Sequence, residues 1–333
     1  MTLNEKVGQL LVVGFDGTEL DEALTSYVSE GAFSGFILFK RNIHSVEGLR
    51  KLTRSLRALY PKTLPPILAV DEEGGRVTQI GHLMAAAPAA SAVGKTRSSR
   101  FAFFQAKDVA QKLRWLGFNV VFAPVLDVND EPANPVIGDR SFGRRPELVS
   151  ALGCATMSGF AEAGLAATGK HFPGHGSATV DSHKALPVIR HPAERWYKFE
   201  FVPFQEAMQS GLRIIMTAHV ACPGLTGRDD LPATFSAQVM DQILRKELGF
   251  DGVVVTDALE MSAADAYMKT GAGPEMAFLA GCDLLLFAFG GSQALVARDA
   301  LAKAVEDGRI SEERLDASIA RITALRKSLA RPG

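Results

Sequence analysis

One short segment carries an unusual density of ionisable side chains. Residues 170–183 contain three of the seven histidines of the chain, together with a lysine and an aspartate, in the sequences KHFPGHG (170–176) and DSH (181–183). A hydrophobic core does not tolerate so many unpaired polar groups, whereas a catalytic loop requires them. Glycine and proline interrupt the segment, which is also typical of a loop. The segment therefore predicts proton-transfer chemistry.

The elements that position this loop follow an alternating pattern. Eight short apolar segments predict buried parallel strands: 10–15, 36–39, 67–70, 120–125, 166–169, 213–217, 252–256 and 283–288. Amphipathic segments predict helices between or after them: 46–59, 102–116, 146–163, 193–209, 237–248, 293–306 and 311–329. Gly117, Gly164 and Gly249 are expected to end helices just before strands.

Eight strand–helix units in 333 residues predict an α/β protein with a (β/α)8 TIM-type barrel. A doubly wound sheet is the rival, but the first strand is not followed by G-x-G-x-x-G. No repeat beyond this alternation and no Pro-, Gly- or Ser-rich linker divides the chain. We therefore expect residues 1–333 to form a single barrel domain.

A barrel of this type places its active site at the carboxyl ends of its strands. Polar side chains lie at or just after the ends of five predicted strands: Asp71, Asp127, Lys170 with His171, His219 and Asp257. Random placement would scatter several of them to strand starts or helix faces. These side chains are therefore expected to surround one site.

Several motifs resemble the signatures of family 3 glycoside hydrolases. They are KHFPGHG with DSH, the segment DEEGGR at 71–76, and TDAL at 256–259, and they occur in the order typical of the family. The resemblance extends over essentially the whole chain. It is strongest to the single-domain bacterial β-N-acetylhexosaminidases that recycle cell-wall fragments.

The resemblance implies a retaining glycosidase in which Asp257 attacks the anomeric carbon. On position alone, Asp257 could instead cap the next helix, which is the less favoured interpretation. The acid/base implied by the resemblance is His183, oriented by Asp181, rather than a second carboxylate. An imidazole titrates near neutral pH, so it can protonate a leaving oxygen and then activate water. Without the preceding motif, Asp181 and His183 would suggest only a surface hydrogen bond.

The resemblance also implies residues that bind the non-reducing sugar. Asp71 is expected to grip two hydroxyl groups, Lys170 and His171 to bind further hydroxyls, and Arg140 to contact substrate from the loop after the fourth strand. A carboxylate and a cation at one sugar make a polar clamp.

The chain departs from the family pattern at two positions. Glu72 replaces a glutamine, and Gln79 occupies a position where an arginine is common. Gln79 can hydrogen-bond a sugar, but not as a cation. For Arg76, pairing with an acidic neighbour is at least as plausible as substrate contact.

Three other polar residues are expected to support the site. We expect Asp127 to organise Lys170 or Arg140, His175 to order its loop, and His219 to support the pocket from behind.

Three alternative functions remain open on the sequence. The histidines and Asp257 superficially suggest a binuclear metallohydrolase, although the first strand ends without the histidine pair of such barrels. A histidine acid/base repels anions less than a carboxylate does, so phosphorolysis is physically allowed. A sugar-binding barrel without activity would not need Asp257, His183 and Asp181 together.

Composition favours a small ligand. The net charge of −1 provides no field that would attract nucleic acid or an anionic membrane. No signal peptide or apolar segment of membrane-spanning length is evident. Cys154, Cys222 and Cys282 lack metal-ligand spacing and are expected to be buried free thiols. We therefore expect a cytoplasmic protein, plausibly monomeric, with no cofactor and no metal.

The sequence thus predicts an exo-acting β-N-acetylglucosaminidase that retains anomeric configuration. The resemblance suggests a GlcNAc-terminated muropeptide as substrate, of the GlcNAc-anhydroMurNAc type. The glycine-rich loop at 172–186 is expected to be able to move.

Overall fold

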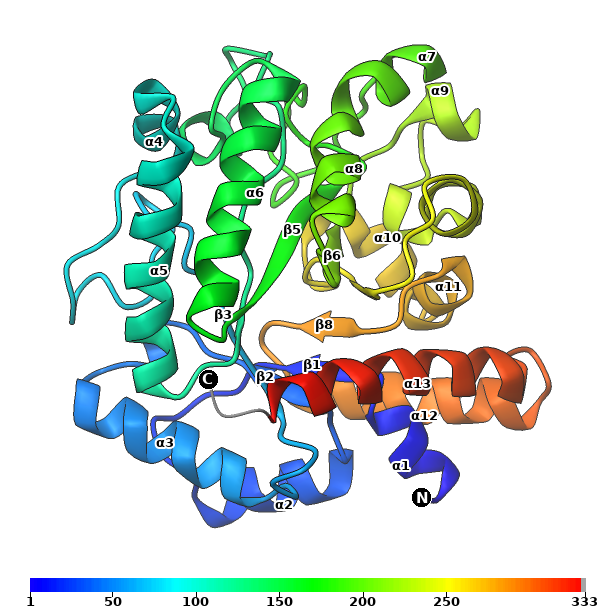
Figure 1. Ribbon diagram of the computed structural model, residues 1–333. Helices are drawn as coiled ribbons and strands as arrows, with labels where there is room; N and C mark the ends of the chain where they lie inside the picture. The colour runs from blue at the N-terminus through cyan, green and yellow to red at the C-terminus, as the bar shows by residue number, and fades with distance from the viewer. Residues whose placement is uncertain (331–333) are drawn as a thin grey trace.

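Eight parallel strands form a closed barrel in the computed structural model, which describes residues 1–330 (Figure 1). The strands are β1 (Leu11–Val13), β2 (Gly35–Ile37), β3 (Ile67–Val70), β4 (Val120–Val121), β5 (Ala166–Phe172), β6 (Ile214–Thr217), β7 (Val253–Val255) and β8 (Leu285–Phe287). Their order is β7-β6-β5-β4-β3-β2-β1-β8. Thr256 donates its N–H to the carbonyl of Leu284 at 2.9 Å, which joins the β7 and β8 edges. The predicted (β/α)8 barrel is confirmed.

Helices surround the barrel (Figure 1). They are α1 (Leu3–Gly8), α2 (Glu22–Gly31), α3 (Val46–Ala58), α4 (Ala90–Thr96), α5 (Ser99–Leu116), α6 (Pro146–Glu162), α7 (Ala193–Arg195), α8 (Val202–Gln209), α9 (Pro223–Thr226), α10 (Asp265–Met268), α11 (Gly273–Ala280), α12 (Ser292–Glu306) and α13 (Glu312–Leu329). Two π-helical segments, η3 (Trp196–Glu200) and η5 (Gln238–Glu247), and four short 3₁₀ turns, η1 (Lys40–Asn42), η2 (Gly138–Arg140), η4 (Ala233–Phe235) and η6 (Ser262–Ala264), complete the elements.

The predicted helices occur, with two differences of form. The segment 193–209 is divided into α7, η3 and α8, and 237–248 is the π-helical η5. Among the helices of eight or more residues in the described chain, two were missed, α2 and α11, and the shorter helices α1, α4, α9 and α10 were also not predicted. The sequence of α11, GPEMAFLA, has almost no polar face because most of the helix is buried, and α2 is only ten residues long.

Glycines end three elements where the sequence predicted it. Gly117, Gly164 and Gly249 have φ angles of 101°, 74° and 74°. Side chains with a Cβ rarely adopt this left-handed conformation, so glycine allows the chain to leave a helix and enter the next strand directly.

The strands are almost entirely buried, and β5 extends further than predicted. It continues through Lys170, His171 and Phe172, so the lysine and histidine of the KHFPGHG motif belong to the strand itself. The peptide bonds Lys170–His171 and Phe172–Pro173 are cis. Because β5 extends to Phe172, the loop that follows begins at the rim of the barrel.

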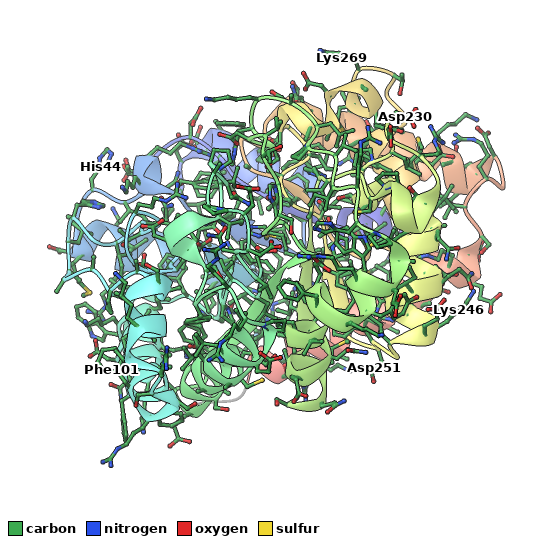
Figure 2. The ribbon with its side chains drawn as sticks, turned by 90° about the horizontal axis from the view of Figure 1, so that it is seen from above. His44, Phe101, Asp230, Lys246, Asp251 and Lys269 are labelled. Carbon is green, nitrogen blue, oxygen red and sulfur yellow. The ribbon has the colours of Figure 1, made fainter. Side chains whose placement is uncertain are left out.

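The surface carries charges of both signs, and Figure 2 shows charged side chains such as Asp230, Lys246, Asp251 and Lys269 at the edge of the molecule. Cys222 and Cys282 are buried, as predicted, but Cys154 is only half-buried because it lies toward the outer side of α6. Within residues 1–330, no helix is long and apolar enough to cross a membrane.

Candidate active site

A cavity of about 680 Å³ opens at the carboxyl ends of the strands. All eight predicted site residues line it: Asp71, Gln79, Arg140, Lys170, His171, Asp181, His183 and Asp257. They come from β5 and from the loops after β3, β4, β5 and β7. Because parallel strands all end at the same rim, residues far apart in the chain meet there.

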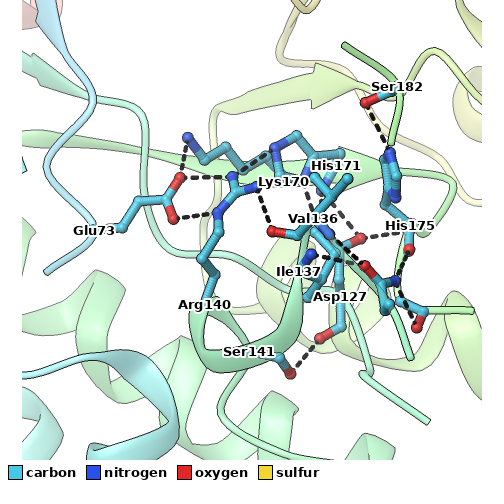
Figure 3. Close-up of polar contacts among 12 residues, drawn as sticks. Glu73, Asp127, Val136, Ile137, Arg140, Ser141, Lys170, His171, His175 and Ser182 are labelled. Atoms are coloured by element: carbon cyan, nitrogen blue, oxygen red, sulfur yellow. Dashed lines mark hydrogen bonds and ion pairs between the residues drawn. The ribbon is translucent and has the colours of Figure 1, made fainter. Parts of the chain in front are cut away.

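Glu73 forms the centre of an ionic network on one wall of the cavity (Figure 3). Its carboxylate receives a bidentate pair of hydrogen bonds from Arg140, at 2.7 and 2.8 Å, and lies 2.6 Å from the Lys170 ammonium. Lys170 also donates to Asp71 at 2.6 Å. The Glu73 and Lys170 side chains are only 3% and 2% exposed, so nearly all of this charge is compensated within the protein.

The charges in this network stabilise one another. Burial alone would raise the pKa of Glu73, but the adjacent Lys170 and Arg140 lower it well below its usual range. Burial would lower the pKa of Lys170, and Asp71 and Glu73 raise it instead. The lysine therefore remains a cation, able to donate to a sugar hydroxyl from a fixed position.

Asp127 organises two histidines. Its Oδ2 accepts from His171 Nδ1 at 2.7 Å, and its Oδ1 accepts the backbone N–H of His175 at 2.6 Å. The expectation that Asp127 organises Lys170 or Arg140 was wrong, because Glu73 binds both cations. The Arg140 guanidinium also lies 3.2 Å from His171 Nε2, so Asp127 and Arg140 together fix the orientation of this ring.

Asp257 lies just beyond β7, half-buried at the cavity. Its Oδ1 accepts the N–H of Ala258 at 2.8 Å, and within the described part of the chain Oδ2 has no hydrogen-bond partner. Burial would raise the pKa of Asp257, but His171, His219, the Ala258 N–H and Lys170 together lower it. An ionised oxygen is therefore available at the cavity.

His183 and Asp181 lie on the loop after β5, at the open side of the cavity. Asp181 Oδ1 accepts from both the backbone N–H and Nδ1 of His183, each at 2.9 Å. The His183 side chain is 64% exposed, and within residues 1–330 its Nε2 has no hydrogen-bond partner, so this nitrogen faces the cavity and solvent. Burial would raise the pKa of Asp181, but these two hydrogen bonds lower it.

The middle of this loop is fixed to the barrel. Ser182 is buried, its hydroxyl lies 3.1 Å from His175 Nε2, and its carbonyl accepts the N–H of Ala263 at 3.1 Å. Burial lowers the pKa of His175 to about 4, so this imidazole is neutral at pH 7. His175 thus orders the loop, as predicted.

His219 supports the backbone next to Asp257. The ring is fully buried, with Nδ1 at 2.8 Å from the Thr234 hydroxyl and Nε2 donating to the carbonyl of Ala258 at 3.0 Å. Burial lowers the pKa of His219, which favours the neutral ring. Its predicted supporting position behind the pocket is confirmed.

The two departures from the family pattern are accommodated structurally. Glu72 Oε2 accepts the backbone N–H groups of Gln79 and Ile80, at 2.8 and 3.2 Å. Gln79 Oε1 accepts the N–H of Lys40 at 3.0 Å, so its amide nitrogen is the group left to face a ligand. Arg76 forms an ion pair with Asp139 at 2.7 Å, as expected for a structural role.

Glu73 was missed by the sequence analysis, although a signal existed. Alternate residues of an extended chain face the same side, so Glu73 shares the side of Asp71, whereas Glu72 points away. Phe39 and Phe289 also line the cavity, and nothing local to their sequence identified them. Among residues 1–330, no three His, Cys, Asp or Glu side chains are arranged to hold a metal ion.

Comparison with known proteins agrees with this geometry. Residues 2–325 match the family model described as the glycosyl hydrolase family 3 N-terminal domain. The chain belongs to glycosyl hydrolase family 3. A family 3 β-N-acetylglucosaminidase from Paenibacillus sp. strain FPU-7 superposes with a TM-score of 0.96 and is 42% identical, covering 100% of this chain and 64% of that one.

Two curated relatives extend the comparison within family 3. A beta-hexosaminidase A of Pseudoalteromonas piscicida is 35% identical, covering 94% of this chain and 56% of its own length. A beta-hexosaminidase of Idiomarina loihiensis is 38% identical, covering 83% of this chain and 82% of its own length. The chain therefore spans little more than half of the first relative and most of the second.

Proposed function

We propose that this family 3 protein is a retaining exo-β-N-acetylglucosaminidase. The observation that carries the proposal is a single cavity lined by a carboxylate with a lowered pKa, Asp257, and by a histidine–aspartate pair, His183 and Asp181. A retaining glycosidase requires a nucleophile and an acid/base at the same bond. The names of the relatives supply the sugar, because most are hexosaminidases or N-acetylglucosaminidases.

In this proposal the terminal sugar occupies the closed end of the cavity. Asp71 and Lys170 bind its hydroxyl groups together with Arg140 and His171, and their ion pairs fix these groups before the substrate arrives. A site that is already ordered loses little entropy on binding, so more of the interaction energy remains for the transition state. Gln79 adds an amide donor at the rim.

The reaction would proceed in two displacements. Asp257 Oδ2 attacks the anomeric carbon while Nε2 of His183 protonates the leaving oxygen, giving a covalent glycosyl–aspartate. The neutral imidazole then takes a proton from water, which attacks the same carbon and releases the sugar with retained configuration. Asp181 holds Nδ1 of His183 throughout, so only Nε2 exchanges protons.

We further propose that residues 1–333 form one catalytic domain that acts as a monomer in the cytoplasm on GlcNAc-terminated muropeptides of the GlcNAc-anhydroMurNAc type. The ionic network around Glu73 supports exo action, because it places several charged groups on one wall of the cavity, where they can bind the hydroxyl groups of a single terminal sugar.

The test is covalent trapping with a slow fluorinated N-acetylglucosaminyl donor. Mass spectrometry of peptic peptides should place one added sugar on Asp257, and the Asp257→Ala variant should remain unlabelled. Turnover of an aryl β-N-acetylglucosaminide should exceed that of the corresponding glucoside. Labelling of another side chain, or no turnover of either glycoside, would refute the proposal, and release of a glycosyl phosphate in phosphate buffer would show a phosphorylase instead.

A further inference from the structure

Two aromatic rings and a guanidinium form a stack at the rim of the cavity. The Arg41 guanidinium lies 4.7 Å from the centre of the Phe39 ring and 5.4 Å from that of Phe289. Phe39 and Arg41 follow β2, whereas Phe289 follows β8, so the stack joins two strand ends. Phe289 is 69% exposed and lines the cavity, although burying a phenylalanine side chain away from water normally stabilises a protein.

The position of Phe289 is fixed by charged side chains. Glu260 accepts the backbone N–H of Ala288 at 3.0 Å on one oxygen and that of Phe289 at 2.9 Å on the other. Arg41 donates to the carbonyls of Ala288 and Phe15, at 2.5 and 3.1 Å. Three hydrogen bonds thus hold the Ala288–Phe289 backbone next to an exposed ring, and a ring held this way can bind a ligand with little further ordering.

A free cation stands beside this stack. Lys40 is exposed and lines the cavity, and within residues 1–330 its ammonium forms no ion pair. The neighbouring charges are engaged: Arg41 lies 3.2 Å from Asp16, Arg76 pairs with Asp139, and both Glu260 oxygens accept backbone N–H groups. Lys40 is therefore the rim cation that can bind an anion without breaking an existing contact.

We propose that Phe289, Phe39 and Lys40 form the subsite for the leaving group, and that Lys40 selects leaving-group sugars that carry a carboxylate. This inference rests on the proposed function, because an exo-glycosidase holds the terminal sugar in the closed end and the leaving group must extend through the rim. The apolar face of a pyranose fits on the exposed Phe289 ring, and a carboxylate on that sugar pairs with Lys40.

Two disaccharides, one neutral and one acidic, test whether Lys40 selects leaving groups that carry a carboxylate. Chitobiose and GlcNAc-β-1,4-MurNAc share the terminal sugar, the bond and the leaving-group ring, and differ in the lactyl carboxylate of MurNAc. We expect the Lys40→Gln variant to lower the ratio of kcat/KM for the acidic over the neutral disaccharide about 2- to 5-fold, as for one exposed ion pair. Lys40→Arg should keep the ratio, and added salt should lower it in the wild type.

The proposed contact between Phe289 and the leaving-group sugar is tested by the KM of both disaccharides. Phe289→Ala should raise KM for both disaccharides about 3- to 10-fold with a smaller change in kcat, and Phe289→Trp should retain the wild-type KM. Lys62→Gln, which changes an exposed lysine between α3 and β3 at the opposite end of the barrel, controls for net charge. Phe104→Ala, on the outer face of α5, controls for loss of an exposed ring.

The outcomes separate this inference from the proposed function. A selectivity ratio that Lys40→Gln leaves within twofold of the wild-type value, or a KM that Phe289→Ala does not change, would overturn the subsite while hydrolysis of an aryl N-acetylglucosaminide continues. If the wild type hydrolyses no N-acetylglucosaminide at all, it is the proposed function that fails.

Discussion

Replacing Glu73 by glutamine tests whether the ionic network holds the site together. The carboxylate is almost completely buried and compensates two buried cations, Lys170 and Arg140. Glutamine has nearly the same shape but carries no charge, and its NH₂ group cannot accept the hydrogen bond that Arg140 Nε donates to Glu73 Oε2. The change therefore leaves an uncompensated cation with little change in packing.

The expected magnitude follows from the surviving contacts. Removing one partner of a buried ion pair costs about 3 to 5 kcal/mol. Lys170 keeps Asp71 and Arg140 keeps the carbonyl of Val136, so we expect the lower end, about 3 kcal/mol at pH 7. With an unfolding entropy of about 2 cal/mol/K per residue over 333 residues, this lowers the Tm by about 4 °C.

The assay is chemical denaturation of the wild type and Glu73→Gln at several pH values, with kcat/KM on an aryl N-acetylglucosaminide measured in parallel. The pKa of Glu73 in the folded state lies below its unfolded value near 4.5, so its contribution to stability is present above pH 4.5. That contribution is lost as the pH falls further. The difference in unfolding free energy between the two proteins should therefore narrow below pH 4.5, and kcat/KM at pH 7 should fall at least about tenfold.

An exposed ion pair provides the control. Glu162 lies 3.3 Å from Lys107 with 57% of its side chain exposed, so Glu162→Gln should change the unfolding free energy by less than about 0.5 kcal/mol. The reasoning is refuted if Glu73→Gln behaves like this control at pH 7, or if its destabilisation grows as the pH falls below 4.5.

Three further changes probe the site. Asp257→Ala should lower kcat by at least about three orders of magnitude while the unfolding free energy shifts by about 1 kcal/mol, because the only hydrogen bond that its side chain makes in the described residues is to Ala258; full activity would exclude Asp257 as nucleophile. His183→Ala should cost about 10²- to 10⁴-fold on substrates with poor leaving groups and much less on activated aryl ones, and equal losses would remove His183 from the acid role. The pKa of His175 falls to about 4 on folding, so between pH 6.5 and 4 the unfolded protein binds a proton that the native protein does not, and the unfolding free energy falls as the pH falls. His175→Gln should make the loss of unfolding free energy between pH 7 and 5 smaller by about 2 kcal/mol. If chemical denaturation shows the same pH dependence for the variant and the wild type, this prediction is wrong.

The fold could be predicted from the sequence because its signal is local and repeated. Each strand is a short apolar segment, and three glycines mark helix ends with the conformation expected of them. The differences between the predicted and observed helices also have local causes. The α11 helix is mostly buried and its exposed side includes Leu279, so it lacks the polar face that reveals a helix. The predicted segment 237–248 is helical, but as the π-helix η5.

The candidate site was predictable residue by residue but not as a network. All eight named residues line the cavity, because the strand ends that carry them converge. Asp127 was assigned the wrong partners, because the sequence does not show whether the carboxylate of Asp127 or that of Glu73 compensates the cations Lys170 and Arg140. The tertiary structure shows that Glu73 is the partner, because its carboxylate lies 2.6 Å from Lys170 and accepts two hydrogen bonds from Arg140.

The sequence by itself determined where the candidate site would form, because the order of apolar and polar segments leads parallel strands to bury their length and to present their carboxyl ends at one rim. It also determined which side chains those ends carry. The tertiary structure alone decided how their charges are paired and what surrounds the rim: Arg41 reaches the carbonyl of a residue 247 positions away, and Phe39 meets the strand end that presents Phe289. Such contacts depend on the closure of the barrel, which brings the first and last strands together, and no local pattern specifies which side chains then meet.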